Sequence, residues 1–400
     1  MRYRTLDSVR GIAAVTVLLH HAAMTFPGGG EHRQEIVAQG INSHQGWLYA
    51  TPLRLAVSGP AAVLLFFVLS GFVLTLNLNS ARQPSYGAFA IARFSRIWIP
   101  FAIAIMIASV LSFCLAARSV PGVSPMFLHN WSQPVTGGHI ARHLAMTGSA
   151  VDLDGPMWSL IHELRISFVF PLLLILTRRF NALSLIGSAL MSFVCIWLIG
   201  PAGIAGHVAT FLQTATYAYF FVIGILVAIH ADKICRFLGS LPRGALALMW
   251  VIALGGLSFS PTDTSHVATI GNGLLLMMSG LSAGLIIALC LIGGWAERLL
   301  MASAPRFLGR ISYSLYLTHM IVMATVLHVV AGAWPLTVSF AIILPLTFVI
   351  ADLSQRYVEA PSQRLGKFLA ERIDLRKAER ALRPSSPISA QPMLRTESEI

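Results

Sequence analysis

Two adjacent histidines near the end of a long apolar run are the first candidates for chemistry. The run extends from Val9 to Phe26, carries Arg10 at its start and ends soon after His20 and His21. In a helix that enters a bilayer, His21 lies roughly 16 Å beyond Arg10, at 1.5 Å of rise per residue. An ionisable group at that depth is costly unless a partner or water receives it, which makes it a candidate functional residue. Adjacent residues point to different helix faces, so one histidine can be structural while the other acts in catalysis.

A carboxylate occupies a similar depth in a later apolar segment. Glu163 lies roughly 9 Å along a helix that begins near Met157, with Ser159 one turn before it and Arg165 two residues after it. A carboxylate bonded to an imidazole fixes the tautomer of the ring and raises its basicity. We therefore predict that Glu163 pairs with His21 and that His21 is a general base. The alternative, a pair within the helix between Glu163 and Arg165, is disfavoured because residues two apart point to different sides.

Two arginines lie one helical turn apart in the stretch IARFSRIWIP. At i and i+3, Arg93 and Arg96 share a helix face, and two guanidinium groups on one face suit the phosphates of a nucleotide-like donor. The alternative is that both are topological anchors whose side chains reach lipid headgroups. The spacing by itself favours the anchors.

Motifs along nearly the whole chain resemble those of the membrane acyltransferase 3 family. LDSVRGIAAVTVLLHHA places Arg10 and His21 in the spacing of the family, and LLFFVLSGFVLTL resembles its second-helix signature, in which Gly71 would let another helix approach closely. The stretches around Glu163, FLGRISYSLYLTHMIV and YVEAPSQRL resemble the motifs that follow. The departures from the family pattern are Ser8, Leu164, Arg165 and Thr318.

The resemblance implies an O-acyltransferase that moves an acyl group, expected to be acetyl, from cytoplasmic acyl-coenzyme A to a hydroxyl of a saccharide, glycolipid or similar acceptor. It also implies that Arg93 and Arg96 bind the donor phosphates. For Arg10 two roles stay open, a further contact to the donor or a contact that locks the helix bundle. No tightly bound cofactor is expected. The residues expected to contact the acceptor or the oxyanion are Ser159, Arg165, Tyr313 and His319. The sequence does not choose among them, and it does not identify the acceptor.

The composition requires that membrane helices position these residues. The chain is 56% hydrophobic and 11% charged, with a mean hydropathy of +0.73, which excludes an ordinary soluble domain. We predict an all-α, polytopic membrane protein with about ten transmembrane helices. The expected spans are 9–26, 58–79, 94–116, 157–177, 182–199, 207–230, 243–259, 271–293, 310–331 and 334–355.

Basic residues predict the orientation of these helices. Most arginines and lysines fall in alternate short loops, which places the N- and C-termini in the cytoplasm and the chain in the inner or plasma membrane. This pattern explains the net charge of +12 without a nucleic-acid partner. The four cysteines stand in separate segments, and we expect no metal site. No oligomeric state is predicted.

We divide the chain into a transmembrane acyltransferase domain over residues 1–360 and a basic, partly disordered cytoplasmic tail over 361–400. Two long outer loops, 27–57 and 117–156, are expected to form the acceptor-binding rim. The alternative function is a multi-pass transporter or flippase of an anionic or glycolipid substrate. It would use His21, Glu163, Arg165 and His319 as a charge relay.

Overall fold

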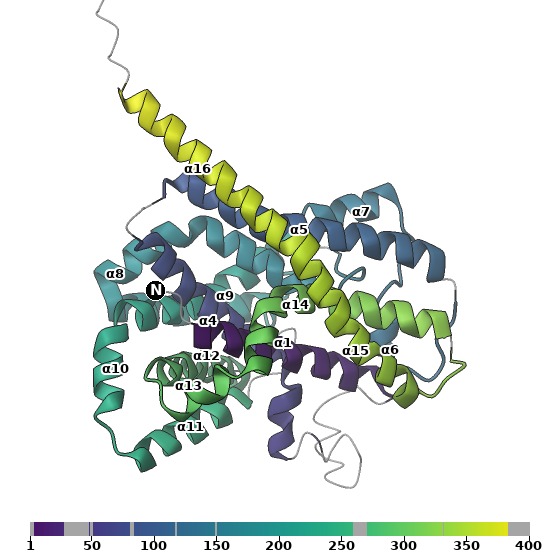
Figure 1. The fold of residues 1–400 in the computed structure, drawn as a ribbon, viewed down its shortest axis with the longest axis horizontal. Helices are drawn as coiled ribbons and strands as arrows, with labels where there is room; N and C mark the ends of the chain where they lie inside the picture. The colour runs from purple at the N-terminus through teal and green to yellow at the C-terminus, as the bar shows by residue number, and fades with distance from the viewer. Residues whose placement is uncertain are drawn as a thin grey trace, which may run out of the picture.

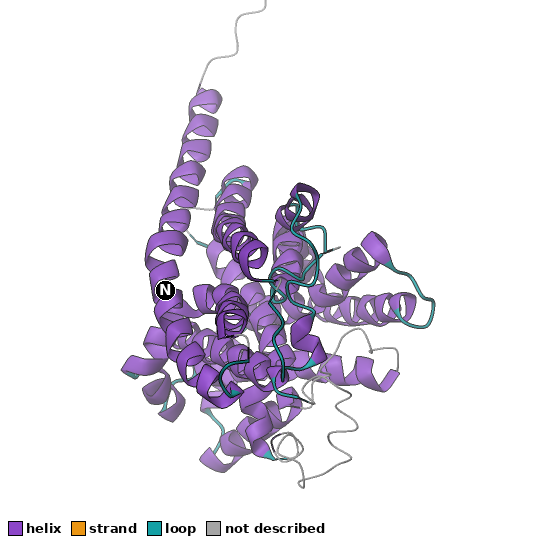
Figure 2. Ribbon diagram, turned by 90° about the vertical axis from the view of Figure 1, so that its right-hand side faces the viewer, coloured by secondary structure: helices purple, strands orange, loops and turns teal. Residues whose placement is uncertain are grey.

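Apolar stretches of the chain form helices that pack side by side in one bundle. The computed structural model describes residues 4–27, 48, 51–80, 84–116, 118–148, 150–258, 270–330 and 332–382. All regular elements in these ranges are helical, as expected for an all-α protein (Figures 1 and 2). The long helices are α1 (Arg4–Thr25), α4 (Gly59–Leu78), α5 (Tyr86–Leu115), α8 (Met157–Ile199), α9 (Gly206–Ile229), α12 (Ile270–Leu291), α14 (Ser303–Val330), α15 (Leu336–Ser354) and α16 (Ala360–Leu382).

Shorter elements connect these helices. They are η2 (Pro52–Val57), α6 (Pro125–Leu128), α7 (Gly137–Leu144), α10 (Ala231–Gly239), α11 (Arg243–Ser258), α13 (Trp295–Leu300) and the π-helical turn η4 (Gln355–Glu359). Of the expected outer loop 27–57, the structure describes residues 27, 48 and 51–57. The second expected loop, 117–156, contains α6 and α7 and is therefore partly helical.

Within the described ranges, seven helices are long and apolar enough to cross a membrane. These are Gly59–Leu78, Tyr86–Leu115, Met157–Ile199, Gly206–Ile229, Gly271–Leu291, Ser303–Val330 and Leu336–Lys377. Three of the expected spans are not among them as separate helices. The expected span 9–26 lies in α1, where Arg10 and the two histidines lower the apolar character. The expected span 243–259 lies in α11, which is short. The expected spans 157–177 and 182–199 are the two limbs of one helix, α8.

A sharp bend divides α8 into these limbs. Phe180 and Asn181 leave the helical region, with φ/ψ of −126°/23° and 4°/−87°. The hydrogen-bonded helix continues on both sides, so the 43-residue helix changes direction between the two expected spans. The total of ten crossings and the cytoplasmic placement of both ends stay predictions.

Close approaches at glycine fix how the central helices pack. Helix α1 packs mainly against α14 and α4, and α4 packs against α9. A Cβ atom at Gly11 would collide with the backbone of Leu308 in α14, and one at Gly224 would collide with the carbonyl of Val68 in α4. Gly71 likewise faces the backbone of Phe221, which confirms the expected close approach at this position.

The C-terminal helix continues from the last apolar helix. One π-helical turn, η4, joins α15 to α16, and α16 packs along α5 before it extends beyond the bundle (Figure 1). The backbone N–H of Ser85 donates to Asp374 Oδ1 at 3.1 Å and ties the two helices together. The expected tail thus begins as an ordered helix. Residues 383–400, where disorder was expected, lie outside the described residues.

Candidate functional site

Glu163 lies at the junction of three helices and forms an ion pair with Arg93. Nη2 of Arg93 on α5 donates to Oε1 of Glu163 on α8 at 2.9 Å, and the Ser70 hydroxyl on α4 donates to the same oxygen at 2.9 Å. Arg93 also donates to the hydroxyl of Ser167, with Nη2 at 3.1 Å. The side chains of Arg93 and Glu163 are 10% and 20% exposed. Most of this charge pair is therefore shielded from solvent.

The expected hydrogen bond between Glu163 and His21 is replaced by this ion pair. Counting along the two helices gives both residues a similar depth, and such a count does not show which residues are lateral neighbours. Helix α1 packs against α14 and α4, whereas α8 packs chiefly against α9. The lateral neighbours of Glu163 are therefore on α5 and α4, and neither Ser70 nor Ser167 was singled out as a partner beforehand.

The three arginines expected to bind the donor lie near one another. Arg96 is close enough to Arg10 and Arg93 for their like charges to repel. Arg10 Nε donates to the Ser312 hydroxyl at 2.9 Å, which links α1 to α14. Arg93 is committed to Glu163, while Arg96 has no hydrogen-bond partner among the described residues. Of the three guanidinium groups, that of Arg96 is the most available to an anionic ligand.

Tyr313 and a buried carboxylate border the same region. The Tyr313 hydroxyl donates to the carbonyl of Ile97 at 2.8 Å, between α14 and α5. Glu359 is buried and accepts hydrogen bonds from the Ser314 hydroxyl at 2.7 Å and from Gln363 Nε2 at 2.9 Å. Glu359 was recognised only as part of the terminal motif. These bonds show that it anchors the start of α16 to α14.

The two adjacent histidines have different surroundings. His20 is buried, and its Nδ1 lies 2.8 Å from the carbonyl of Val57, so this ring ties α1 to η2. His21 is only partly buried, and its ring centroid lies 5.2 Å from that of His319 on α14. His20 therefore has a structural contact, and the role of His21 in chemistry stays a prediction.

His319 has one ring nitrogen available to accept a proton or hydrogen bond. Its Nδ1 lies 3.1 Å from the carbonyl of Leu315, one turn earlier in α14. Because a carbonyl only accepts, Nδ1 carries the proton of the neutral ring and Nε2 carries a lone pair. His319 is fully buried, and Nε2 has no hydrogen-bond partner among the described residues. A polar atom of this kind beside His21 is suited to a bound substrate or water.

Ser159 and Arg165 differ in their relation to these histidines. The Ser159 hydroxyl lies 2.7 Å from the Tyr316 hydroxyl, which donates to the carbonyl of Pro156 at 2.9 Å. The Tyr316 and His319 ring centroids are 6.0 Å apart, so Ser159 belongs to the histidine region through Tyr316. Tyr316 was noted in its motif without a role.

Arg165 instead joins α8 to its neighbours. Its guanidinium donates to the carbonyls of Thr147 at 3.0 Å and Thr210 at 3.2 Å, and it lies 4.3 Å from the centre of the Phe211 ring. Arg165 departs from the family pattern, and these contacts show that it serves the packing of α8 against its neighbours. The expectation that Arg165 contacts the acceptor or the oxyanion is not supported by its neighbours.

Two buried features of the segment between α5 and α8 were not predicted. Asp154 is fully buried, and burial raises the pKa of its carboxyl group well above the ordinary value. His139, His143 and Asp152 form a compact cluster. The four-residue spacing of the two histidines was the sequence signal that could have revealed it.

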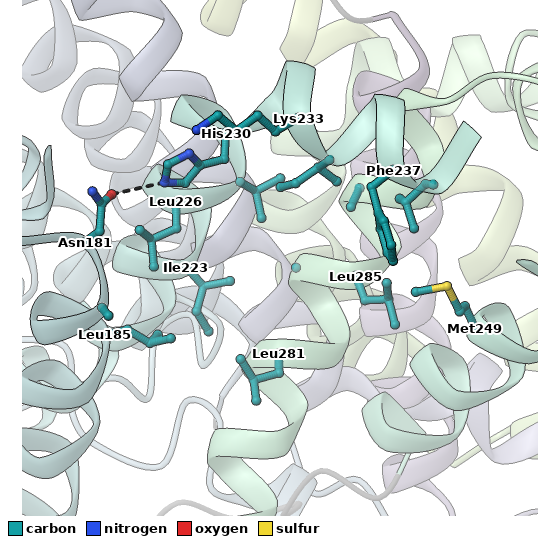
Figure 3. A pocket seen from close by; sticks show the side chains of 16 residues that line it. Asn181, Leu185, Ile223, Leu226, His230, Lys233, Phe237, Met249, Leu281 and Leu285 are labelled. Atoms are coloured by element: carbon teal, nitrogen blue, oxygen red, sulfur yellow. Dashed lines mark hydrogen bonds between the residues drawn. The ribbon is translucent and has the colours of Figure 1, made fainter. Parts of the chain in front are cut away.

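A cavity of about 680 Å³ lies away from all of these residues, beside the bend in α8 (Figure 3). Side chains from α8, α9, α10, α11 and α12 line it, and nearly all of them are apolar. At one edge, His230 Nε2 lies 3.1 Å from Asn181 Oδ1. None of the predicted site residues contributes to this cavity, so we do not assign it to the reaction.

Comparisons with known proteins agree with the motifs. The sequence model of the family described as acyltransferase domain (Acyl_transf_3) matches residues 3–356. The chain is 26% identical over 345 residues to nodulation protein 10 of Rhizobium leguminosarum bv. viciae. This alignment covers 80% of the present chain and 86% of that protein. It is 22% identical over 439 residues to the O-acetyltransferase PaAT-1 of Phomopsis amygdali, and this alignment covers 92% of the present chain and 84% of that protein. No solved structure gives a significant match.

Proposed function

The chain belongs to the acyltransferase 3 family, and from this membership we propose that it acetylates an acceptor hydroxyl at the outer side of the inner or plasma membrane. The donor is cytoplasmic acyl-coenzyme A, and the acceptor is a saccharide, a glycolipid or a similar molecule. That the chain is a multi-pass membrane acyltransferase follows from the family and the long apolar helices. The acetyl group is supported by the name of the relative from Phomopsis amygdali.

The observation that carries the proposal is the neighbouring pair of His21 and His319. His21 is partly exposed, and His319 presents a buried Nε2 without a partner in the described residues. A hydroxyl is a weak nucleophile near neutral pH, so acyl transfer to it needs a general base. His21 takes the hydroxyl proton as the oxygen attacks the thioester carbonyl. The C–S bond then breaks, and His21 returns the proton to the departing sulfur.

The arginine cluster supports a donor that enters from the opposite end of the bundle. Arg10 and His21 are eleven positions apart on one helix, which corresponds to roughly 16 Å along its axis. Coenzyme A has its phosphates at one end of a long arm and its thioester at the other. Arg96, with Arg10 beside it, binds the phosphates, and the arm extends along α1 toward His21. Tyr316 and Ser159, which share a hydrogen bond near His319, contact the acceptor or the oxyanion.

Charge and helix packing support the orientation. With both termini cytoplasmic, the basic residues of α16 and α10, and Arg243 at the start of α11, face the negative inner leaflet. Ten crossings then result when α1 and α11 each cross the membrane and the two limbs of the bent helix α8 cross it separately, in addition to the other helices recognised by length and composition. Membership of an enzyme family favours acyl transfer over the transporter alternative.

The test compares cells that lack the gene with cells that carry the wild type, His21→Ala or His20→Ala. Mass spectrometry of surface glycans and secreted metabolites should show a species one acetyl group heavier in the wild type. The species should be absent with His21→Ala and present with His20→Ala when the protein levels match. An acetylated species that persists with His21→Ala would overturn the assignment of the base. A gene-dependent change without acylation would overturn the proposed reaction.

A further inference from the structure

A cluster of two imidazoles and one carboxylate lies in the segment between α5 and α8, apart from the residues of the proposed reaction. His139 and His143 stand one turn apart on α7, and Asp152 follows in the loop that leads to α8. All three side chains are buried, with residue exposures of 2%, 0% and 6%. One potential ligand atom from each lies within 4.8 Å of the others.

The distances within this cluster match those between ligands of one ion. Asp152 Oδ1 lies 3.0 Å from His139 Nε2 and 3.6 Å from His143 Nε2. Nitrogen and oxygen ligands bind Zn²⁺ at about 2.0–2.2 Å in a tetrahedral arrangement, which separates neighbouring ligand atoms by about 3.4 Å. The two observed distances lie on either side of this value. An ion would therefore need only small side-chain adjustments.

The tautomer of His143 also fits a metal ligand. Its Nδ1 lies 3.0 Å from the carbonyl of His139 and therefore carries the proton. Its Nε2 therefore carries the only lone pair of the ring, which lies 3.6 Å from Asp152 Oδ1 and accepts a long hydrogen bond from the backbone N–H of Leu153 at 3.4 Å. A bound ion would take the place of this long hydrogen bond. Metal-binding histidines are commonly oriented in this way, by donating the other ring N–H to a backbone carbonyl.

An unsatisfied atom separates a metal site from a simple ion pair. His139 and Asp152 alone would account for their 3.0 Å contact. The ion pair would not account for Asp152 Oδ2, which is buried without a hydrogen-bond partner in the described part of the chain. Buried polar atoms are nearly always satisfied, so this carboxylate lacks a ligand for its second oxygen. An ion bound through both oxygens would provide one.

We propose that His139, His143 and Asp152 bind a structural divalent transition-metal ion, which the imidazole and carboxylate donors identify as Zn²⁺. The two Nε2 atoms and the Asp152 carboxylate, with its second oxygen turned toward the ion, supply the three protein ligands. The ion joins α7 to the loop just before Met157, where α8 begins. The same loop is held by Trp131, whose indole N–H donates to the carbonyl of Leu153 at 3.2 Å. The ion thus fixes the start of the helix that carries Ser159 and Glu163.

The test uses the full-length protein purified without a polyhistidine tag, in detergent or lipid nanodiscs. The protein is first incubated with a small excess of Zn²⁺ and then dialysed against metal-free buffer, after which elemental analysis should find about one zinc ion per chain. Removal with EDTA should lower the thermal midpoint of unfolding, and Zn²⁺ but not Mg²⁺ should restore it. Absence of bound zinc together with an EDTA-insensitive midpoint would overturn the proposal.

Asp152→Asn is the key variant because it preserves the shape of the side chain and can still accept a hydrogen bond from His139. It should weaken zinc binding by at least about 100-fold, and its midpoint should no longer respond to EDTA. His139→Ala should lose zinc as well. His129→Ala, at an exposed histidine of the same segment, is the matched control and should bind zinc like the wild type. Full zinc content and EDTA sensitivity in Asp152→Asn would refute the site.

Discussion

Glu163 neutralises Arg93 inside the bundle, and loss of its side chain should therefore destabilise the fold. Removal of one partner of a buried ion pair typically costs about 3–5 kcal/mol, because the other charge is left uncompensated. Glu163 keeps some exposure, and Arg93 retains the Ser167 hydroxyl, so we expect a loss near the lower end for Glu163→Ala, about 3 kcal/mol. Glu163→Gln keeps an acceptor for Ser70 and Arg93 and should cost about 1–2 kcal/mol.

A double-mutant cycle measures this interaction. Arg93→Ala, Glu163→Ala and the double variant are purified in the same detergent, and their free energies of unfolding are compared with that of the wild type. The coupling should reach about 1–3 kcal/mol, since the side chains are in direct contact. Glu297→Gln, at an exposed carboxylate on α13, is the control and should change little. A coupling below about 0.5 kcal/mol would refute the pairing.

The pH profile of the reaction distinguishes this role from the one predicted from the sequence. A carboxylate bonded to His21 would raise the pKa of that histidine, so its neutralisation would shift the acidic limb of the rate profile to lower pH. The structure gives the bonds of Glu163 to Arg93 and Ser70 instead. We therefore expect Glu163→Gln to leave the acidic limb in place, whatever its effect on the rate. A shift to lower pH would restore the sequence-based pairing.

His21→Ala should abolish acyl transfer without loss of folded protein. His20→Ala should mainly lower stability, because His20 bonds the carbonyl of Val57. The rate of acyl transfer per folded molecule separates the two effects. Arg96→Ala should raise KM for the acyl donor about tenfold or more, the loss expected for a charge-assisted hydrogen bond. Arg96→Lys should recover only part of it, because an ammonium cannot replace a planar fork, and an unchanged KM in both variants would contradict donor binding. Gly224→Ala should lower the thermal midpoint strongly, since its Cβ would meet the carbonyl of Val68, while Gly187→Ala, which faces open space, should not. Equal midpoints for these two variants would show that α4 and α9 can separate at little cost.

The positions of the helices were predictable because each one is set by a local property of the chain. The expected spans 58–79 and 207–230 coincide with Gly59–Leu78 and Gly206–Ile229 to within one residue at each end. A continuous apolar run must satisfy its own backbone in the bilayer, which leaves a helix as the only open choice. The close approach at Gly71 was also predictable, since only a residue without a side chain lets two helix backbones meet.

Partners across the bundle were much less predictable. The sequence placed His20 and His21 on different helix faces, but only the position of Val57 shows which one is structural. The cluster on α7 escaped notice because Asp152 belongs to a loop whose path no periodicity describes. Arg165 was grouped with the site for its charge, and its bonds to Thr147 and Thr210 show that it holds helices together.

The sequence by itself determined the family and the helical class, because motifs and composition are sufficient for these. The depth of each ionisable group stays an estimate from 1.5 Å of rise per residue. Only the tertiary structure decided that Glu163 faces Arg93 and that His21 faces His319. Depth is one coordinate along a helix axis. Lateral neighbours depend on the rotation and packing of every helix in the bundle. This packing rests on contacts between residues far apart in the chain, such as the hydrogen bond from Arg10 to Ser312.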